Sequence, residues 1–260
     1  MIKTKREYSI LNAQYIFDFG KDVSSTEMPT KLNNPFSDGV SQIARVAAEE
    51  FQHFISEESK LWKYDFDGQK GKMFGVLVIQ KKDNSFGYLG TISGKLSRTE
   101  SCNKFIPTVF DDSVGDYFIN RGMTELSEIS GQIKSATDPA SIKSLKENSK
   151  NKSIALQRRL FQNYSFINLS GRKKNLLEIF RESSHASPPS GAGECTAPKL
   201  LHCAIEHGLK PIALAEFWWG NSDKKKERLH KSFYPACKDK CRPILEYMLE
   251  DQGLFESRNS

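Results

Sequence analysis

The spacing of apolar residues predicts a helix followed by a β-hairpin near the start of the chain. Five apolar residues recur at the three- and four-residue spacing of an amphipathic helix: Val40, Ile43, Ala47, Phe51 and Phe54. The nearly continuous apolar run 74–80, the polar turn 82–85 and the apolar run 86–92 predict two buried strands joined by a short turn. Residues 1–38 show neither period, so we expect them to be irregular.

The pattern changes in residues 113–182, which we interpret as an inserted helical hairpin. Apolar residues at helical spacing predict one helix over 119–133 and a second over 142–164. Pro139 separates them, because proline lacks an N–H and restricts the residue before it. We expect this segment to project from one domain that is formed by residues 1–112 and 183–260.

The last part of the chain predicts a helix, a strand and another helix. The helix begins at Thr196 and ends at Gly208, the strand covers 211–219, and the last helix begins at Cys237. Without the hairpin, the order is helix, strand, strand, helix, strand, helix. This order predicts an α/β fold in which a small mixed sheet is flanked by helices.

Composition limits the cellular setting. The chain has 260 residues, 38% of them hydrophobic, and no apolar run approaches the roughly 20 residues of a membrane helix. The charged N-terminus is not followed by the apolar segment of a secretory signal. The cysteines number five, and three of them cluster. Reduced thiols in the cytoplasm are therefore expected, with no membrane partner.

Basic residues occur in runs that favour RNA as a partner. The net charge is +6 and the isoelectric point is near 8.9. Any single run is typical of a solvated helix face or loop, but the runs together favour an RNA-binding surface. The candidate contacts are Lys146, Lys150, Arg158, Arg159, Lys173, Lys174, Lys225 and Arg228.

Three cysteines have the arrangement of metal ligands. Cys195 stands at the start of one predicted helix, and Cys237 and Cys241 stand at the start of another. Residues four apart share a helix face, so the last two sulfurs can approach one ion. Helix N-termini favour the thiolate form, and soft sulfur ligands favour zinc. The alternative is that these are small buried thiols without a metal.

The fourth ligand would decide what a zinc ion does here. Three protein ligands leave a position open for chemistry, whereas a fourth side chain closes a structural site. His230 lies shortly before Cys237 and is the candidate fourth ligand.

The order of elements and the cysteines resemble the zinc deaminase fold of nucleobase- and cytidine-deaminase families. The resemblance implies that the thiols hold zinc and that a nearby glutamate carries protons. In the family this glutamate stands two residues after the first ligand, where this chain has Ala197, and three rather than two residues separate the paired cysteines. Glu194 or Glu216 could replace the missing acid, which makes a zinc-dependent nucleobase or nucleoside deaminase the alternative function.

Three whole segments, 188–201, 213–220 and 233–245, resemble the long N-terminal region in a subset of RluA-type pseudouridine synthases. In these enzymes a catalytic domain follows, with an aspartate in an Arg-Leu-Asp motif. The nearest string here is Arg228-Leu229-His230. The resemblance therefore implies an accessory RNA-interacting region, for modification of rRNA or tRNA. The chain is then either a fragment of a longer synthase, whose catalytic domain it lacks, or a standalone relative.

Overall fold

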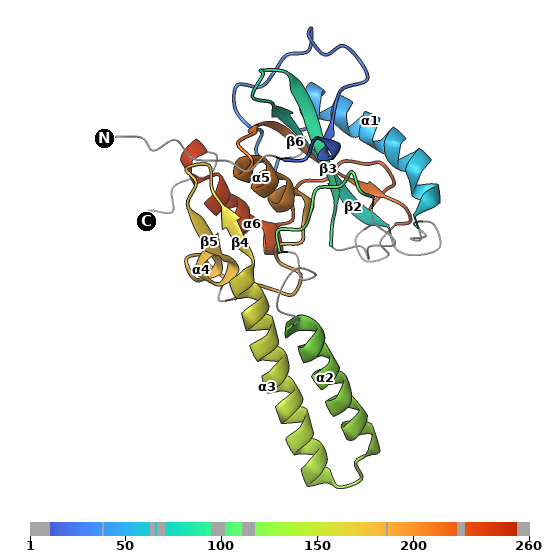
Figure 1. Ribbon diagram of the computed structural model, residues 1–260, viewed down its shortest axis with the longest axis vertical. Coiled ribbons are helices and arrows are strands. Elements are labelled where there is room, and N and C mark those ends of the chain that lie inside the picture. Colours follow the sequence, from blue (N-terminus) through green and yellow to red (C-terminus); the bar gives the residue numbers. More distant parts are fainter. Residues whose placement is uncertain are drawn as a thin grey trace, which may run out of the picture.

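The molecule consists of a body of sheet and helices from which two long helices project (Figure 1). The computed structural model describes residues 11–37, 39–62, 66, 71–94, 102–110, 118–185, 187–222 and 227–253. Within these ranges, no helix combines the length and the apolar character that crossing a membrane requires.

The body is built around a four-stranded sheet with the order β1-β3-β2-β6. Its strands are β1 (Ile16–Phe17), β2 (Lys72–Gln80), β3 (Phe86–Ile92) and β6 (Lys210–Trp219). All pairings within it are antiparallel, so the mixed sheet expected from the sequence is corrected to an antiparallel one. Strand direction depends on the side from which the chain re-enters the sheet, and apolar spacing does not encode that side.

Helices cover both faces of the sheet, as the sequence predicts for an α/β fold. Helix α1 (Gln42–Glu58) packs on the face that carries Phe74, Val76 and Val78 of β2. Helix α5 (Thr196–Glu206) lies on the opposite face, and α6 (Lys238–Met248) packs against α5 (Figure 1). Because successive side chains of a strand point to opposite faces, each face has its own apolar core.

The edge strand β1 comes from the segment that we expect to be irregular. Ile16 pairs with Leu89, and Phe17 pairs with Tyr88 at a ring-centroid distance of 5.1 Å. A strand of two residues is too short for alternation to reveal it. The stacked aromatic pair, rather than a periodic pattern, fixes this segment on the sheet.

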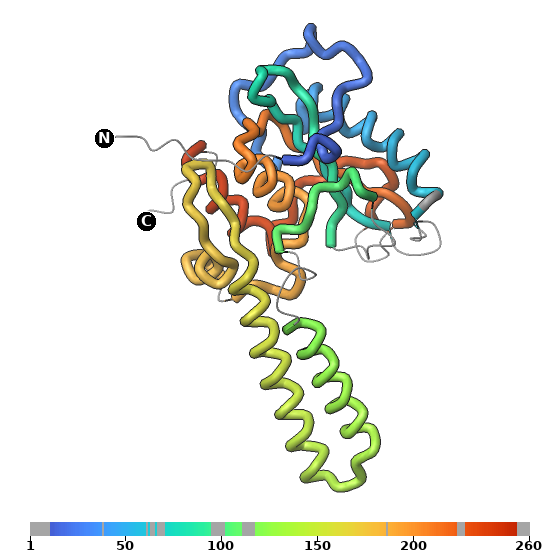
Figure 2. The backbone as a smooth tube through the Cα atoms, viewed as in Figure 1, coloured from blue at the N-terminus to red at the C-terminus, as the bar shows by residue number. Residues whose placement is uncertain are grey.

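The projecting part is an antiparallel pair of helices, α2 (Phe118–Ser135) and α3 (Pro139–Asn163). Asp138 caps α3, because its carboxylate accepts the Ser141 N–H at 2.9 Å. Figure 2 shows that the pair extends away from the body, and the end of α3 that carries the buried Phe161 joins it.

Residues 164–182, which the sequence analysis places in the hairpin, pack into the body. They form β4 (Ser165–Ile167), β5 (Lys173–Asn175) and α4 (Leu176–Arg181). The side chains of Phe166, Leu176 and Phe180 are fully buried in the same core as α5 and α6. Strands of three residues leave no periodic signal, so β4 and β5 are absent from the sequence prediction.

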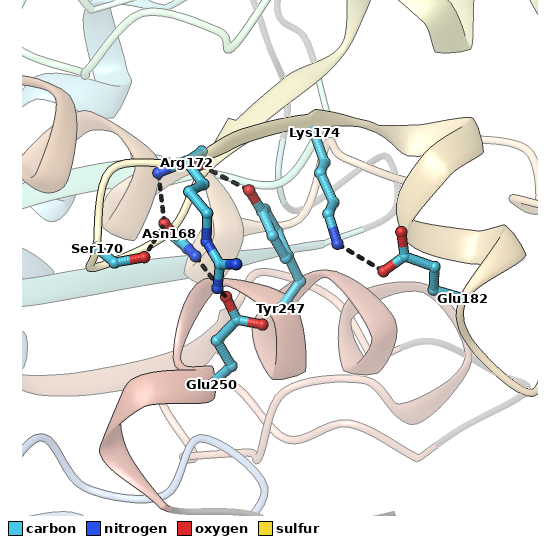
Figure 3. Close-up of polar contacts among 7 residues, drawn as sticks. All are labelled: Asn168, Ser170, Arg172, Lys174, Glu182, Tyr247 and Glu250. Carbon is cyan, nitrogen blue, oxygen red and sulfur yellow. Dashed lines mark hydrogen bonds and ion pairs between the residues drawn. The ribbon is translucent and has the colours of Figure 1, made fainter.

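A polar network attaches the β4–β5 turn to α6 and to the turn just after it (Figure 3). Arg172 and the amide of Asn168 both contact Glu250, and the Tyr247 hydroxyl donates to the Arg172 carbonyl at 2.6 Å. These bonds link β4 and β5 to α6 and to the turn that follows it. Arg172 is therefore engaged within the fold.

Candidate metal centre

The N-termini of two helices bring three thiols together. Cys195 is the N-cap of α5, Cys237 is the N-cap of α6, and Cys241 follows one turn later. The Sγ atoms all lie within 4.8 Å of one another. Those of Cys195 and Cys237 are 3.9 Å apart, and those of Cys237 and Cys241 are 3.2 Å apart.

These separations suit a single metal ion. Tetrahedral zinc with four sulfur-like ligands at 2.3 Å would place neighbouring sulfurs about 3.8 Å apart. The two separations given above lie on either side of this value. Cys241 is buried, whereas Cys195 and Cys237 are partly exposed. The three cysteines could therefore hold a metal ion that approaches from the surface.

Two glycines allow α5 to begin where it does. Gly193 has a φ of +89°, and a Cβ there would lie 2.9 Å from the ring of Tyr164. Gly75 of β2 faces the start of α5, and a Cβ there would lie 2.9 Å from Cβ of Thr196. The first turn of α5 thus rests directly on β2, and this contact fixes the height of Cys195 above the sheet.

Glu216 lies beside the thiols. It pairs with Gly75 across β6 and β2, and its carboxylate accepts hydrogen bonds from the Thr196 hydroxyl and, at 3.2 Å, from the Ala197 N–H. Burial, followed by the nearby charge of Cys237, raises the pKa of Glu216 to about 8. The Ala197 N–H and the charge of Arg228 oppose this shift of the pKa.

The three thiols differ in acidity. Hydrogen bonds with Cys195 and Cys241 lower the pKa of Cys237. The hydrogen bond with Cys237 raises the pKa of Cys195, and those with Cys195 and then Cys237 raise the pKa of Cys241. The helix N-termini favour the thiolate form, whereas the neighbouring sulfurs disfavour further negative charge. A bound cation reverses this preference by supplying positive charge to all three sulfurs.

His230 and Glu194 lie outside the thiol group. Nδ1 of His230 accepts the Gly220 N–H at 3.0 Å, and its ring centroid is 4.4 Å from that of Trp219. Glu194 accepts a hydrogen bond from the Tyr164 hydroxyl. The sequence places both residues near cysteines, but the turns around them direct their side chains to other partners.

The basic candidates divide into engaged and exposed residues. Lys173 pairs with Glu206 at 2.9 Å, Lys174 pairs with Glu182 at 2.5 Å (Figure 3), and Arg159 and Arg228 lie over aromatic rings at 4.2 and 5.1 Å. Lys225 lies outside the described residues. The remaining candidates are exposed on α3: Lys146, Lys150 and Arg158.

Sequence reasoning missed Gly75 and Thr196. Each carried a signal: a glycine inside an apolar strand marks a close approach of another backbone, and Thr196 is a polar residue at the start of an otherwise apolar helix face. Only the packing of α5 on β2 shows that both serve the same site.

Comparison with known proteins identifies no relative. No protein-family model, no curated protein and no solved structure matches this chain. Function is therefore argued from the thiol cluster, the buried carboxylate and the distribution of charge.

Proposed function

We propose that this chain is a zinc-binding, RNA-interacting accessory region of an RluA-type pseudouridine synthase. The observation that carries the metal part is the approach of three Sγ atoms within 4.8 Å. Thiolate ligands favour zinc over hard cations, and reduced thiols fit a cytoplasmic protein. In this proposal, the rRNA or tRNA is modified by a catalytic domain outside the chain.

The proposed zinc is structural, and because the described residues bring three protein ligands together, its fourth position would be closed by a group from outside this thiol cluster. Cys195, Cys237 and Cys241 would hold it, and the ion would join the starts of α5 and α6, which are 42 residues apart in the chain. Such a link stabilises the folded state because the unfolded chain has no preformed site. The resemblance of the segments 188–201, 213–220 and 233–245 supplies the family, and the exposed basic residues of α3 support the RNA contact.

Metal analysis tests the zinc centre. Purified protein should contain one zinc per chain, and Cys237→Ser and Cys241→Ser should each lose most of it. Cys102→Ser is the matched control, because Cys102 is a free cysteine outside the cluster and its loss should leave the zinc in place. Zinc well below one per chain in protein prepared without chelators would contradict the proposal.

One observation favours a second candidate, a zinc-dependent nucleobase or nucleoside deaminase. The resembled family has its glutamate at the position of Ala197, and here the Glu216 carboxylate reaches the Ala197 N–H from β6. A carboxyl group whose pKa is about 8 can hold and release a proton near neutral pH. When bound, zinc would supply the activated water that attacks the ring carbon bearing the exocyclic amino group.

Product analysis separates the two candidates. The deaminase predicts ammonia release from a nucleobase or nucleoside by the zinc-loaded protein. In that case Glu216→Gln should lower the rate by about 10²–10⁴-fold with the zinc content unchanged. Absence of deaminated product across cytosine, adenine and guanine compounds would leave the structural role.

A further inference from the structure

Helix α3 concentrates positive charge. Its 25 residues include six basic residues and one acidic residue, Glu147. The basic residues are Lys143, Lys146, Lys150, Lys152, Arg158 and Arg159. The like charges on this helix repel one another unless acidic side chains or a bound polyanion neutralise them. The position of each basic residue around the helix therefore shows which of them are available to bind a polyanion.

Some of these residues face α2. Nζ of Lys152 pairs with Glu125 at 2.7 Å, and the Arg159 guanidinium lies 4.2 Å from the ring centroid of Phe118. Leu156 lies on the same side, because a Cβ on Gly122 would meet it at 2.7 Å. These contacts define the inner side of α3.

The other basic residues lie on the opposite side. At 3.6 residues per turn, Lys143, Lys146, Lys150 and Arg158 are rotated by about 120–180° from Lys152. We call these four residues the outer face of α3. All four are exposed, and none forms an ion pair with another described residue. Glu147 also lies on this side and is likewise exposed.

The position of the hairpin keeps the outer face accessible. The two helices extend away from the body, and the described body elements that contact α3 most, α4 and β5, meet it near its C-terminal end (Figures 1 and 2). From Lys143 to Arg158 the outer face extends about 22 Å along the helix, at 1.5 Å per residue. It therefore presents a row of cations spread over about 120° of the helix surface rather than a pocket.

The chemistry of this row fits a phosphate backbone. Proteins that grip single strands stack the bases on aromatic side chains. The outer face has no aromatic residue, and Phe161, the aromatic residue of α3, is buried. Double-stranded RNA is bound mainly through its shape, its phosphates and its 2′-hydroxyls, because its major groove is too narrow for side chains to read.

We propose that the outer face of α3 docks along the phosphate backbone of double-helical RNA. The contact is sequence-independent and positions the RNA relative to the body. The choice of RNA over another polyanion rests on the proposed function. The choice of these four residues rests on the geometry of α3, and the choice of a duplex rests on the absence of aromatic residues from the outer face.

Fluorescence anisotropy with a labelled RNA hairpin and a single-stranded RNA of equal length tests the inference. The outer-face variant is Lys143→Glu/Lys146→Glu/Lys150→Glu, and the matched control is Lys21→Glu/Lys31→Glu/Lys60→Glu on exposed positions of the body. Both change the net charge equally. The wild-type protein should prefer the duplex, and the outer-face variant should bind it about tenfold or more weakly, with a salt dependence reduced by about one unit of slope per lost contact.

Each other outcome is informative. If the two variants weaken RNA binding equally, or if the outer-face variant binds RNA as the wild type does, the outer face is not the site. In both cases the RNA role of the chain survives. Preference for the single strand overturns the duplex, and so does full competition by polyglutamate at equal charge concentration, because it would show that the outer face recognises negative charge alone. If the wild-type protein binds neither RNA at low salt, the RNA part of the proposed function fails as well, while its zinc content stands independently. Circular dichroism of the variant, and Lys→Gln replacements at the same positions, separate lost binding from lost helix.

Discussion

At the scale of single residues, the position of the thiol cluster depends on the contact between Gly75 and Thr196. A side chain at position 75 would project toward α5, on the face of the sheet that carries Glu216. The missing side chain allows the Thr196 hydroxyl to reach the Glu216 carboxylate. The same close approach sets the position of Cys195, the residue before Thr196.

Gly75→Ala should therefore weaken both folding and metal binding. The added Cβ would lie 2.9 Å from Cβ of Thr196, so the start of α5 must move away from β2. We expect a loss of about 1–3 kcal/mol in the free energy of unfolding and a lower zinc affinity. Urea unfolding and competition with a chelator measure the two effects.

Gly131→Ala is the control for this substitution. Gly131 lies within α2, and a Cβ there meets no atom within 4 Å. Alanine should stabilise this helix by about 1 kcal/mol without affecting the zinc affinity. Zinc affinity that is unchanged by Gly75→Ala would show that α5 can shift without moving Cys195.

At the scale of elements, ion pairs link strands and helices whose contact the apolar pattern of the sequence does not predict. Glu206 at the end of α5 contacts His202 of the same helix at 3.2 Å and Lys173 of β5 at 2.9 Å. The hydrogen bond with His202 lowers the pKa of Glu206 most, and that with Lys173 also lowers it, to about 2. Burial of the carboxyl acts in the opposite direction.

This pKa predicts an acid-sensitive connection. The pKa of Glu206 is lower in the folded state than its ordinary value of 4.5, so its stabilisation is fully present above that value. The stabilisation is lost as the pH falls toward 2. Glu206→Gln should accordingly reduce the pH dependence of unfolding between pH 4.5 and 2, measured with urea. The exposed Glu128→Gln is the control, and an equal effect of both substitutions would exclude a specific role for Glu206.

The hairpin depends on its helix cap. The Asp138 carboxylate accepts both the N–H and the hydroxyl of Ser141, at 2.9 and 2.8 Å. Asp138→Ala should lower stability by about 1 kcal/mol, because the first turn of α3 loses a partner for its N–H groups. Asp138→Asn, which can accept the same bonds, should retain most of it. Hydrogen exchange at residues 140–142 measures the local loss, and equal exchange in all three proteins would argue against the cap.

At the scale of the whole molecule, the body and the hairpin should respond separately to metal. The three thiols connect α5 and α6 within the body, whereas α2 and α3 contact each other and extend beyond it (Figure 1). Metal binding stabilises the part of the fold that supplies the ligands. A change in metal content should therefore alter the stability of the body and not that of the hairpin.

Chelation should lower the thermal stability of the body alone. If zinc is bound, its removal should decrease the Tm by about 2–4 °C for each kcal/mol of binding free energy linked to folding. Hydrogen exchange should increase in α5, α6 and β6 and remain unchanged in residues 118–163. Faster exchange in the hairpin as well would show that the two parts fold as one unit.

The sequence by itself determined the long elements. Apolar spacing located α1, β2, β3, α5 and β6, and Pro139 located the boundary between α2 and α3, because these signals depend on local geometry. It also identified the three cysteines, since residues four apart on a helix must share a face. Strands of two or three residues, β1, β4 and β5, gave no such signal.

Only the tertiary structure decided which residues meet. It placed Glu216 under the start of α5, directed His230 to Gly220 and Trp219, and paired Lys173 and Lys174 with carboxylates while leaving the outer face of α3 exposed. These outcomes depend on strand direction and on contacts between residues far apart in the chain. A local pattern carries no information about either, because a side chain's partners are set by the packing of whole elements.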